Sequence, residues 1–172
     1  MSLRLNRSLN ILLFLICLLV PASAFCQENA PRSTGGLYPE EVISAEDLKK
    51  KMDSHEDLLL LDARNKQSFD SGHIDGAQLP RSEDYYRQEE LFRTGTAPQS
   101  PDPDKALVEW TGPFPKDRLI VTYCNSDCHA SAVLALRLKQ LGFAHVLSME
   151  EGFQSWEKKG FPIQPKKVIV KA

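Results

Sequence analysis

Two short runs of uninterrupted apolar residues stand out in the middle of the chain. Residues 58–61 are all leucine, and residues 119–123 read Leu-Ile-Val-Thr-Tyr. Neither run alternates as a strand with one solvated face would, so both indicate strands that are covered on two sides, as in a parallel sheet. The first run leads into Asp62, and the second leads directly into Cys124.

Helical periodicity is clearest over residues 130–141, where Gly142 supplies a C-terminal stop. The apolar stripe of this helix consists of Val133, Leu134, Leu138 and Leu141. Two further helices are predicted after Ser44 and over about residues 151–159, and shorter strands at 42–43, near 74–79 and at 145–147. Strands that alternate with helices predict an α/β domain with a mainly parallel sheet.

Residues 81–117 show little clear period. Residues 85–92 fit a helix, but residues 94–104 contain three prolines and are expected to form a loop. A structureless stretch of this length is uncommon in a compact domain unless it is functional. We therefore expect residues 81–117 to be a long loop or insert, which either covers a site or binds a protein partner.

The first 24 residues have the features of a cleaved signal peptide. A basic start is followed by an apolar run over residues 9–20, and Ala22-Ser23-Ala24 has the small-x-small pattern of a cleavage site. A retained anchor is the alternative, although the run is shorter than the roughly 20 apolar residues of a membrane span. Lipoprotein processing at Cys26 is disfavoured by the bulky Phe25. We expect an exported protein, periplasmic or secreted, that meets a membrane only through an uncleaved signal.

Cleavage would leave a mildly acidic chain with an odd number of cysteines. Losing Arg4 and Arg7 reduces the 21 basic residues to 19 against 23 acidic residues, a formal charge of −4. This balance argues against a nucleic-acid partner. Three cysteines remain, Cys26, Cys124 and Cys128, which is a poor disulfide framework, so at least one thiol is expected to be free or reactive.

The chemistry centres on residues 124–129, Cys-Asn-Ser-Asp-Cys-His, which connect a buried strand to the best helix. In open α/β sheets, ligands bind at the carboxyl ends of parallel strands. A tight strand-to-helix connection turns successive backbone N–H groups toward one point, and such a nest stabilises negative charge. Cys124 is therefore expected to have a depressed pKa and to be a reactive thiolate, with a buried structural cysteine as the alternative.

Four stretches in this order resemble the rhodanese family over about residues 40–163. They are Leu59-Leu60-Leu61-Asp62-Ala63-Arg64, the turn Phe69-Asp70-Ser71-Gly72-His73-Ile74-Asp75-Gly76-Ala77, the strand Ile120-Val121-Thr122-Tyr123-Cys124, and the closing Gly152-Phe153-Gln154-Ser155-Trp156 with Gly160 and Pro162. The resemblance implies a central, mainly parallel five-stranded sheet with helices on both faces. Residues 25–39 would then be a flexible leader and residues 164–172 a basic tail.

The resemblance also implies an activity. Cys124 would take a sulfane sulfur from a small donor as a persulfide and pass it to a thiol or another nucleophile, without a cofactor or metal. The loop Cys124, Asn125, Ser126, Asp127, Cys128 and His129 would cradle the sulfur. Many members have Gly at the position of Asp127 and Arg at that of His129. An Arg would offer a fixed cation and a bidentate fork to an anionic donor, so these two departures argue against thiosulfate as the preferred donor.

Three other side chains have more than one interpretation. Cys128 is a candidate resolving thiol, although inward-facing loop amides would send its side chain outward, so that a bridge to Cys124 would require the loop to open. Packing at the helix start is its alternative role. Asp62 and Arg64 are expected to support the loop rather than to react.

Three other kinds of site fit the residues around Cys124 less well. The spacing of Cys124, Cys128 and His129 is one residue longer than a c-type haem attachment motif. A zinc site would need more ligands than these three residues offer. A phosphatase of the related cell-cycle type would need Arg at position 130, which is Ala.

Two functional hypotheses from different classes remain open. The first is an exported sulfurtransferase that uses Cys124. The second is a non-catalytic rhodanese-like module that binds sulfur species or a protein through residues 81–117. A thiol-redox protein that uses Cys124 and Cys128 is a further alternative. A cysteine at position 124 favours the first, because an inactive module needs none there.

Overall fold

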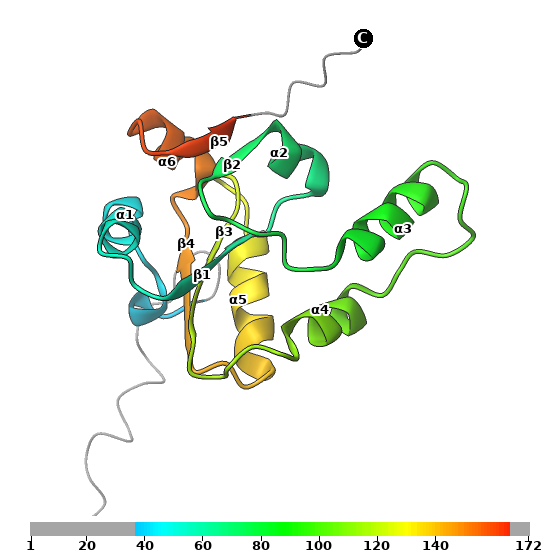
Figure 1. Ribbon diagram of the computed structural model, residues 1–172, viewed down its shortest axis with the longest axis horizontal. Coiled ribbons are helices and arrows are strands. Elements are labelled where there is room, and N and C mark those ends of the chain that lie inside the picture. The colour runs from blue at the N-terminus through cyan, green and yellow to red at the C-terminus, as the bar shows by residue number, and fades with distance from the viewer. Residues whose placement is uncertain (1–36, 166–172) are drawn as a thin grey trace, which may run out of the picture. The chain divides into compact units, whose positions relative to one another are not determined.

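The computed structural model describes residues 37–165, so the predicted signal peptide, most of the leader and most of the basic tail lie outside the described residues. Its centre is a parallel sheet of β1 (Leu58–Asp62), β3 (Leu119–Tyr123) and β4 (His145–Met149) in the order β1-β3-β4 (Figure 1). The two apolar runs of the sequence are thus paired neighbours, with Leu58 opposite Leu119. The prediction of a mainly parallel α/β sheet is confirmed.

The sheet has fewer full strands than the five expected. Beside β4, Val42 makes a single parallel bridge to Ser148, and beside β1, Gln78 makes one to Leu61. These bridges continue the sheet on both sides, but neither segment extends into a strand. Gly76 and Pro80 surround Gln78, and a turn residue and a residue without an N–H both interrupt strand pairing. The expectation of five strands is therefore only partly met.

A second ladder was not predicted. β2 (Gly72–Ile74) pairs in antiparallel fashion with β5 (Ile163–Pro165), and Ile74 lies opposite Ile163. This pair brings the chain after the last helix back beside the segment that follows β1, at the end of the sheet where Cys124 lies.

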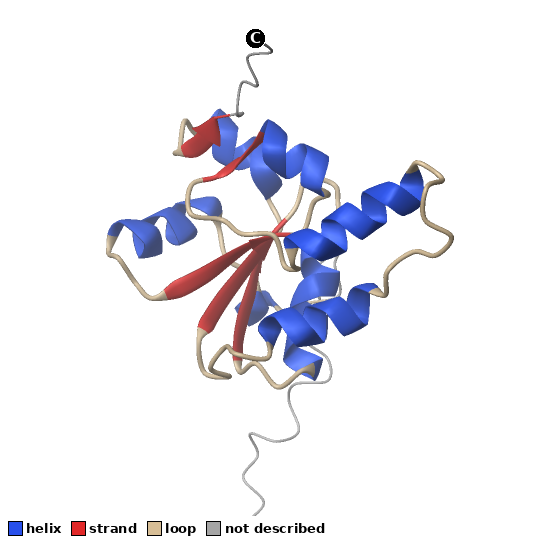
Figure 2. Ribbon diagram, turned by 45° about the vertical axis from the view of Figure 1, so that its right-hand side comes forward, coloured by secondary structure: helices blue, strands red, loops and turns tan. Residues whose placement is uncertain are grey.

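Helices cover both faces of the parallel sheet (Figure 2). On one face, α5 (Ala130–Gln140) packs on β3 and β4 and shares a core with Leu59 and Leu61 of β1. On the other, α1 (Ala45–Asp53) and α6 (Gly152–Lys158) share a core with Leu60. Successive strand residues point to opposite faces, so a run of leucines is needed to fill both cores. Within the described residues, no helix has the length and apolar character needed to cross a bilayer.

Residues 81–117 are not a long loop, and that prediction is wrong for most of the segment. It contains α3 (Glu83–Arg93), within which the expected helical residues 85–92 lie, and α4 (Pro103–Thr111). The side chain of Asp102 caps α4 by accepting from the N–H groups of Asp104 and Lys105. Pro103 stands in the first turn, where a missing N–H is harmless, so this proline starts the helix instead of preventing it.

Candidate functional site

Cys124 leaves β3 at the carboxyl end of the sheet, as expected. The residue is only 2% exposed to solvent. Its carbonyl accepts a hydrogen bond of 2.8 Å from the N–H of Phe153 at the start of α6. α5 begins at Ala130, directly after His129, so residues 124–129 form the short strand-to-helix connection that the sequence predicts.

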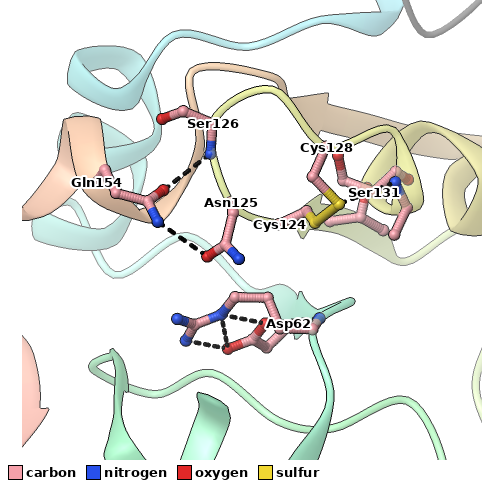
Figure 3. Close-up of a disulfide and its surroundings, with 10 residues drawn as sticks. Asp62, Cys124, Asn125, Ser126, Cys128, Ser131 and Gln154 are labelled. Atoms are coloured by element: carbon pink, nitrogen blue, oxygen red, sulfur yellow. Dashed lines mark hydrogen bonds and ion pairs between the residues drawn. A yellow bond between two sulfur atoms is a disulfide. The ribbon is translucent and has the colours of Figure 1, made fainter.

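The main correction concerns Cys128. The structure joins Cys124 and Cys128 in a disulfide with a Cα–Cα distance of 6.1 Å (Figure 3). Asp127, between them, has φ 61°, and this left-handed turn directs the chain back toward Cys124. The loop therefore carries the bridge in its compact form, contrary to the expectation that it would have to open. In this state the Cys124 sulfur is bonded, so the predicted thiolate belongs to the reduced protein.

The other half of the loop is held by α6. The side chain of Gln154 accepts from the Ser126 N–H at 2.8 Å and donates to Asn125 Oδ1 at 3.1 Å (Figure 3). The hydroxyl of Ser126 donates to the carbonyl of Glu151 at 2.8 Å. The N–H of Ser126 thus bonds to a side chain, and the expectation that all loop amides converge on one anion is wrong for this residue.

Gly152 makes this contact between loop and helix possible. A Cβ atom at this position would lie 2.2 Å from the Ser126 nitrogen and 2.5 Å from the Asn125 carbonyl carbon. Gly152 also has φ 77°, which disfavours side chains. The site loop therefore lies against the bare backbone of α6, and only glycine allows it to approach so closely.

Asp62 and Arg64 form a buried ion pair below the loop. Arg64 Nη2 lies 2.6 Å from Asp62 Oδ2, with side-chain exposures of 6% and 0%. The hydroxyl of Tyr123 donates to the same carboxylate at 2.7 Å. Burial acts to lower the pKa of Arg64, but the hydrogen bonds and the charge of Asp62 outweigh it, so the pKa is raised and Arg64 stays charged.

Tyr123 connects this pair to the rest of the site. Its hydroxyl also accepts the N–H of Ile74 at 3.2 Å, so one oxygen joins β1, β2 and β3. Burial and the adjacent Asp62 carboxylate raise the pKa of Tyr123, which keeps the phenol a hydrogen-bond donor. Tyr123 is the residue that links Asp62 and Arg64 to β3, the strand that leads into Cys124.

A cleft of about 480 Å³ opens beside the loop. One wall is α2 (Lys66–Ser71), a short helix that no periodicity in the sequence predicts, although Asn65 caps it by accepting the N–H of Ser68. The opposite wall belongs to α6. The lining residues are Arg64, Gln67, Ser68, Ser71, Gly72, Asn125, Phe153, Gln154, Glu157, Ile163 and Gln164. Cys124 itself does not line the cleft, which reaches the loop through Asn125.

Arg64 forms part of the cleft wall although its head group is largely buried. The guanidinium lies over the Phe153 ring, 4.1 Å from the centroid, and donates to the carbonyl of Gly72 at 2.7 Å. Because the guanidinium is paired with Asp62, Arg64 brings little net positive field to the cleft.

The remaining loop residues face solvent. Asp127 and His129 are exposed, and the His129 side chain does not cap α5. Instead the N–H of Ala130 donates to the Cys128 sulfur at 3.5 Å. This sulfur therefore takes the place of the oxygen that usually caps a helix N-terminus.

Two site residues had only weak signals in the sequence. Gly152 and Gln154 belong to the closing motif by which the family resemblance was drawn, but their contacts with the loop were not foreseen. The identity of Gln154 alone does not reveal these contacts, because α6 reaches the loop only through the tertiary fold.

The fold and site define an α/β protein with a cysteine at the carboxyl end of a central parallel strand, followed by a short loop and a helix. The model of the rhodanese-like domain matches residues 44–159. The chain belongs to the rhodanese-like domain family.

Relatives with assigned names are similar at a modest level. The probable adenylyltransferase/sulfurtransferase MoeZ of Mycobacterium tuberculosis is 28% identical over 148 residues, 84% of this chain. The chain spans only 31% of that relative's length. A sulfurtransferase of Allochromatium vinosum is 29% identical over 122 residues, which cover 70% of this chain and 92% of that protein.

Solved structures support the fold. The rhodanese-like domain of the Alr3790 protein from Anabaena sp. superposes with a TM-score of 0.55 at 22% identity, covering 77% of this chain and 85% of that one. The BH2092 protein from Bacillus halodurans gives a TM-score of 0.56 at 19% identity, covering 74% and 78%.

Proposed function

We propose that this protein is a sulfurtransferase that carries sulfane sulfur as a persulfide on reduced Cys124. The observation that carries the proposal is the position of Cys124, at the end of a buried parallel strand and at the start of a short loop that leads into a helix. Ligands of open α/β sheets bind at the carboxyl ends of the strands, and a helix N-terminus favours a thiolate. Two relatives named as sulfurtransferases support the same chemistry.

The donor is a persulfide or polysulfide, whose attacked sulfur needs less anion binding, rather than thiosulfate. The exposed loop carries Asp127 and His129, and Arg64 is neutralised by Asp62. Within the described residues that line the cleft, Arg64 is the only Arg, Lys or His. Amide and hydroxyl groups from Ser68, Ser71 and Gln154 suit a polar, uncharged part of a donor or acceptor.

We further propose that the protein is exported and that it binds a protein partner. The N-terminal pattern supports export to the periplasm or beyond. Residues 81–117 form a two-helix segment that can receive a partner protein, and exposed Phe92 and Val108 lie on its helices.

Intact mass tests the function directly. The protein is first reduced and desalted, because the disulfide blocks Cys124, and is then exposed to sodium polysulfide or thiosulfate. A gain of one sulfur that transfers to an added thiol, and that is absent in Cys124→Ser, supports the sulfurtransferase. A reduced and folded protein that gains no sulfur and releases no sulfide with either donor would instead indicate a non-catalytic binding module.

A further inference from the structure

The second cysteine of the site loop has no role in the proposed function, yet the structure bonds it to the first. Cys124 and Cys128 have Cα atoms 6.1 Å apart, within the usual range for a disulfide. They lie on the same short loop, whose backbone is turned by Asp127 at φ 61°. The sulfur of Cys128 therefore reaches the atom that would carry the persulfide.

The surroundings of Cys128 favour its thiolate. The sulfur accepts the N–H of Ala130 at 3.5 Å, at the start of the 11-residue helix α5. The N-terminal N–H groups of a helix lack partners within the helix and carry partial positive charge. Since His129 provides no side-chain cap, the Cys128 sulfur is the acceptor present at this helix start in the described structure. A thiolate at Cys128 would be stabilised there as a nucleophile.

We propose that Cys128 is a resolving thiol that discharges the Cys124 persulfide as sulfide and produces the disulfide of this structure. The inference rests on the proposed function, because it requires a persulfide on Cys124. It gives the protein a second activity, the reduction of sulfane sulfur to sulfide, in addition to the transfer of sulfur onto an external acceptor.

The step is balanced as a thiol–disulfide exchange. The Cys128 thiolate attacks the inner sulfur, Cys124 Sγ, and forms the Cys124–Cys128 bond. The bond from Cys124 Sγ to the outer sulfur breaks, and its electron pair leaves with that sulfur, which carries the persulfide proton away as HS⁻. The Cys128 sulfur is oxidised to disulfide, the sulfane sulfur is reduced to sulfide, and no other oxidant is needed.

A dithiol closes the cycle. Cys124 is buried whereas Cys128 is partly exposed, so an incoming thiolate reaches the Cys128 sulfur and expels Cys124 as the leaving thiolate. The second thiol of the reductant then resolves the mixed disulfide on Cys128. This returns both cysteines as thiols and the reductant as its disulfide. Attack on the exposed sulfur therefore restores the sulfur-carrying thiolate first.

The lifetime of the persulfide tests the inference. Reduced wild-type protein, Cys128→Ser and Cys124→Ser are each given sodium polysulfide, desalted and followed by intact mass and by a sulfide assay, without added thiol. We expect Cys128→Ser to keep one extra sulfur at least about tenfold longer than the wild type, since an intramolecular thiol acts at high effective concentration. The wild type should release one sulfide per chain while losing two alkylatable thiols.

Controls separate the two claims. Cys26→Ser, which removes a thiol of the leader, should behave as the wild type. If the wild type and Cys128→Ser hold the sulfur equally long, the resolving role is wrong while the sulfurtransferase stands. If folded Cys128→Ser takes up no sulfur, the proposed function falls and the resolving step with it. Should Cys128→Ser fail to fold, Cys128→Ala replaces it. The wild type then gives a second test of the resolving role, because the step requires one sulfide released for every two thiols lost.

Discussion

The backbone of Gly152 touches the backbone of the site loop, so a Cβ atom on Gly152 would lie 2.2 Å from the nitrogen of Ser126. Neither partner can move as a flexible side chain would, because the contact joins two main chains. The position of the loop that holds Cys124 is thus coupled to the start of α6.

Gly152→Ala should therefore damage both stability and the site. We expect it to lower the free energy of unfolding by about 2–4 kcal/mol, from the clash and the left-handed φ together, and to reduce persulfide loading of Cys124. Urea unfolding and intact mass measure the two effects. Gly160→Ala is the matched control, because Gly160 also has positive φ, 69°, but an added Cβ there would meet nothing within 4 Å. An equal loss of stability in both variants would show that the contact between the added Cβ and the loop backbone does not destabilise the protein.

Tyr123→Phe tests the buried network below the loop. The substitution removes one hydroxyl that donates to Asp62 at 2.7 Å and accepts from Ile74 at 3.2 Å. A buried group left without its partner costs about 1–3 kcal/mol, so we expect a destabilisation in that range. Tyr85→Phe is the control, since its hydroxyl makes a 3.4 Å contact with Glu89 at a partly exposed site, and it should change stability by less than about 0.5 kcal/mol. Similar small effects in both would mean that water replaces the Tyr123 hydroxyl.

Glu151 is expected to contribute to the free energy of unfolding by an amount that depends on pH. Its carboxylate receives hydrogen bonds from Lys159 Nζ, Ser155 Oγ and the N–H of Ala45, and the bond from Lys159 is the main reason why the pKa of Glu151 lies below its ordinary value of 4.5. A group with a lowered folded pKa stabilises the protein above its unfolded pKa, and the contribution is lost as pH falls through the folded pKa.

Glu151→Gln should accordingly be less stable than the wild type at pH 7, and the difference should narrow below about pH 4.5. We expect less than about 1 kcal/mol, because the ion pair with Lys159 is partly exposed and screened by salt. Thermal unfolding from pH 7 to 3 measures it. Glu157→Gln, on the same helix, serves as the control. A difference between the wild type and Glu151→Gln that stays constant over this range would rule out the charge as the cause.

The core strands and the position of Cys124 at the end of β3 could be predicted because local sequence determines them. The runs 58–61 and 119–123 must fill both faces of a sheet, and they do so as neighbours. Helix α5 has a glycine stop and buries Leu134 and Leu138 of the predicted stripe, but Val133 of that stripe is exposed. These features need no knowledge of distant contacts.

Other features depend on tertiary context or on a short capping signal. Helices α2 and α4 begin directly after their N-cap residues, Asn65 and Asp102, and these caps outweigh weak periodicity and nearby prolines. The bonds of Gln154 to the loop, and the use of the Ser126 amide, arise only when α6 folds back onto residues 125–126. The disulfide could not be read from spacing, because it depends on the left-handed turn at Asp127.

The last prediction concerns donor choice. Thiosulfate must approach a loop whose exposed side chains include Asp127 and His129. An Arg at position 129 would add a fixed cation worth about 1–3 kcal/mol of charge-assisted hydrogen bonding. At about 1.36 kcal/mol for each tenfold change, this corresponds to roughly ten- to hundred-and-fifty-fold in donor affinity or rate.

Asp127→Asn with His129→Arg should thus raise thiosulfate loading of Cys124 more than either change alone, because both act on one anion. Asn is chosen over Gly because it removes the charge and still tolerates φ 61°, so the backbone turn stays as it is. Loading is followed by intact mass on reduced protein with limiting thiosulfate, and polysulfide, which needs less anion binding, should respond much less. His129→Gln is the neutral control and should leave the selectivity near that of the wild type. If the double variant loads thiosulfate no faster while Cys124→Ser abolishes loading, then loop charge does not select the donor, and the N–H groups around Cys124 must hold the anion alone.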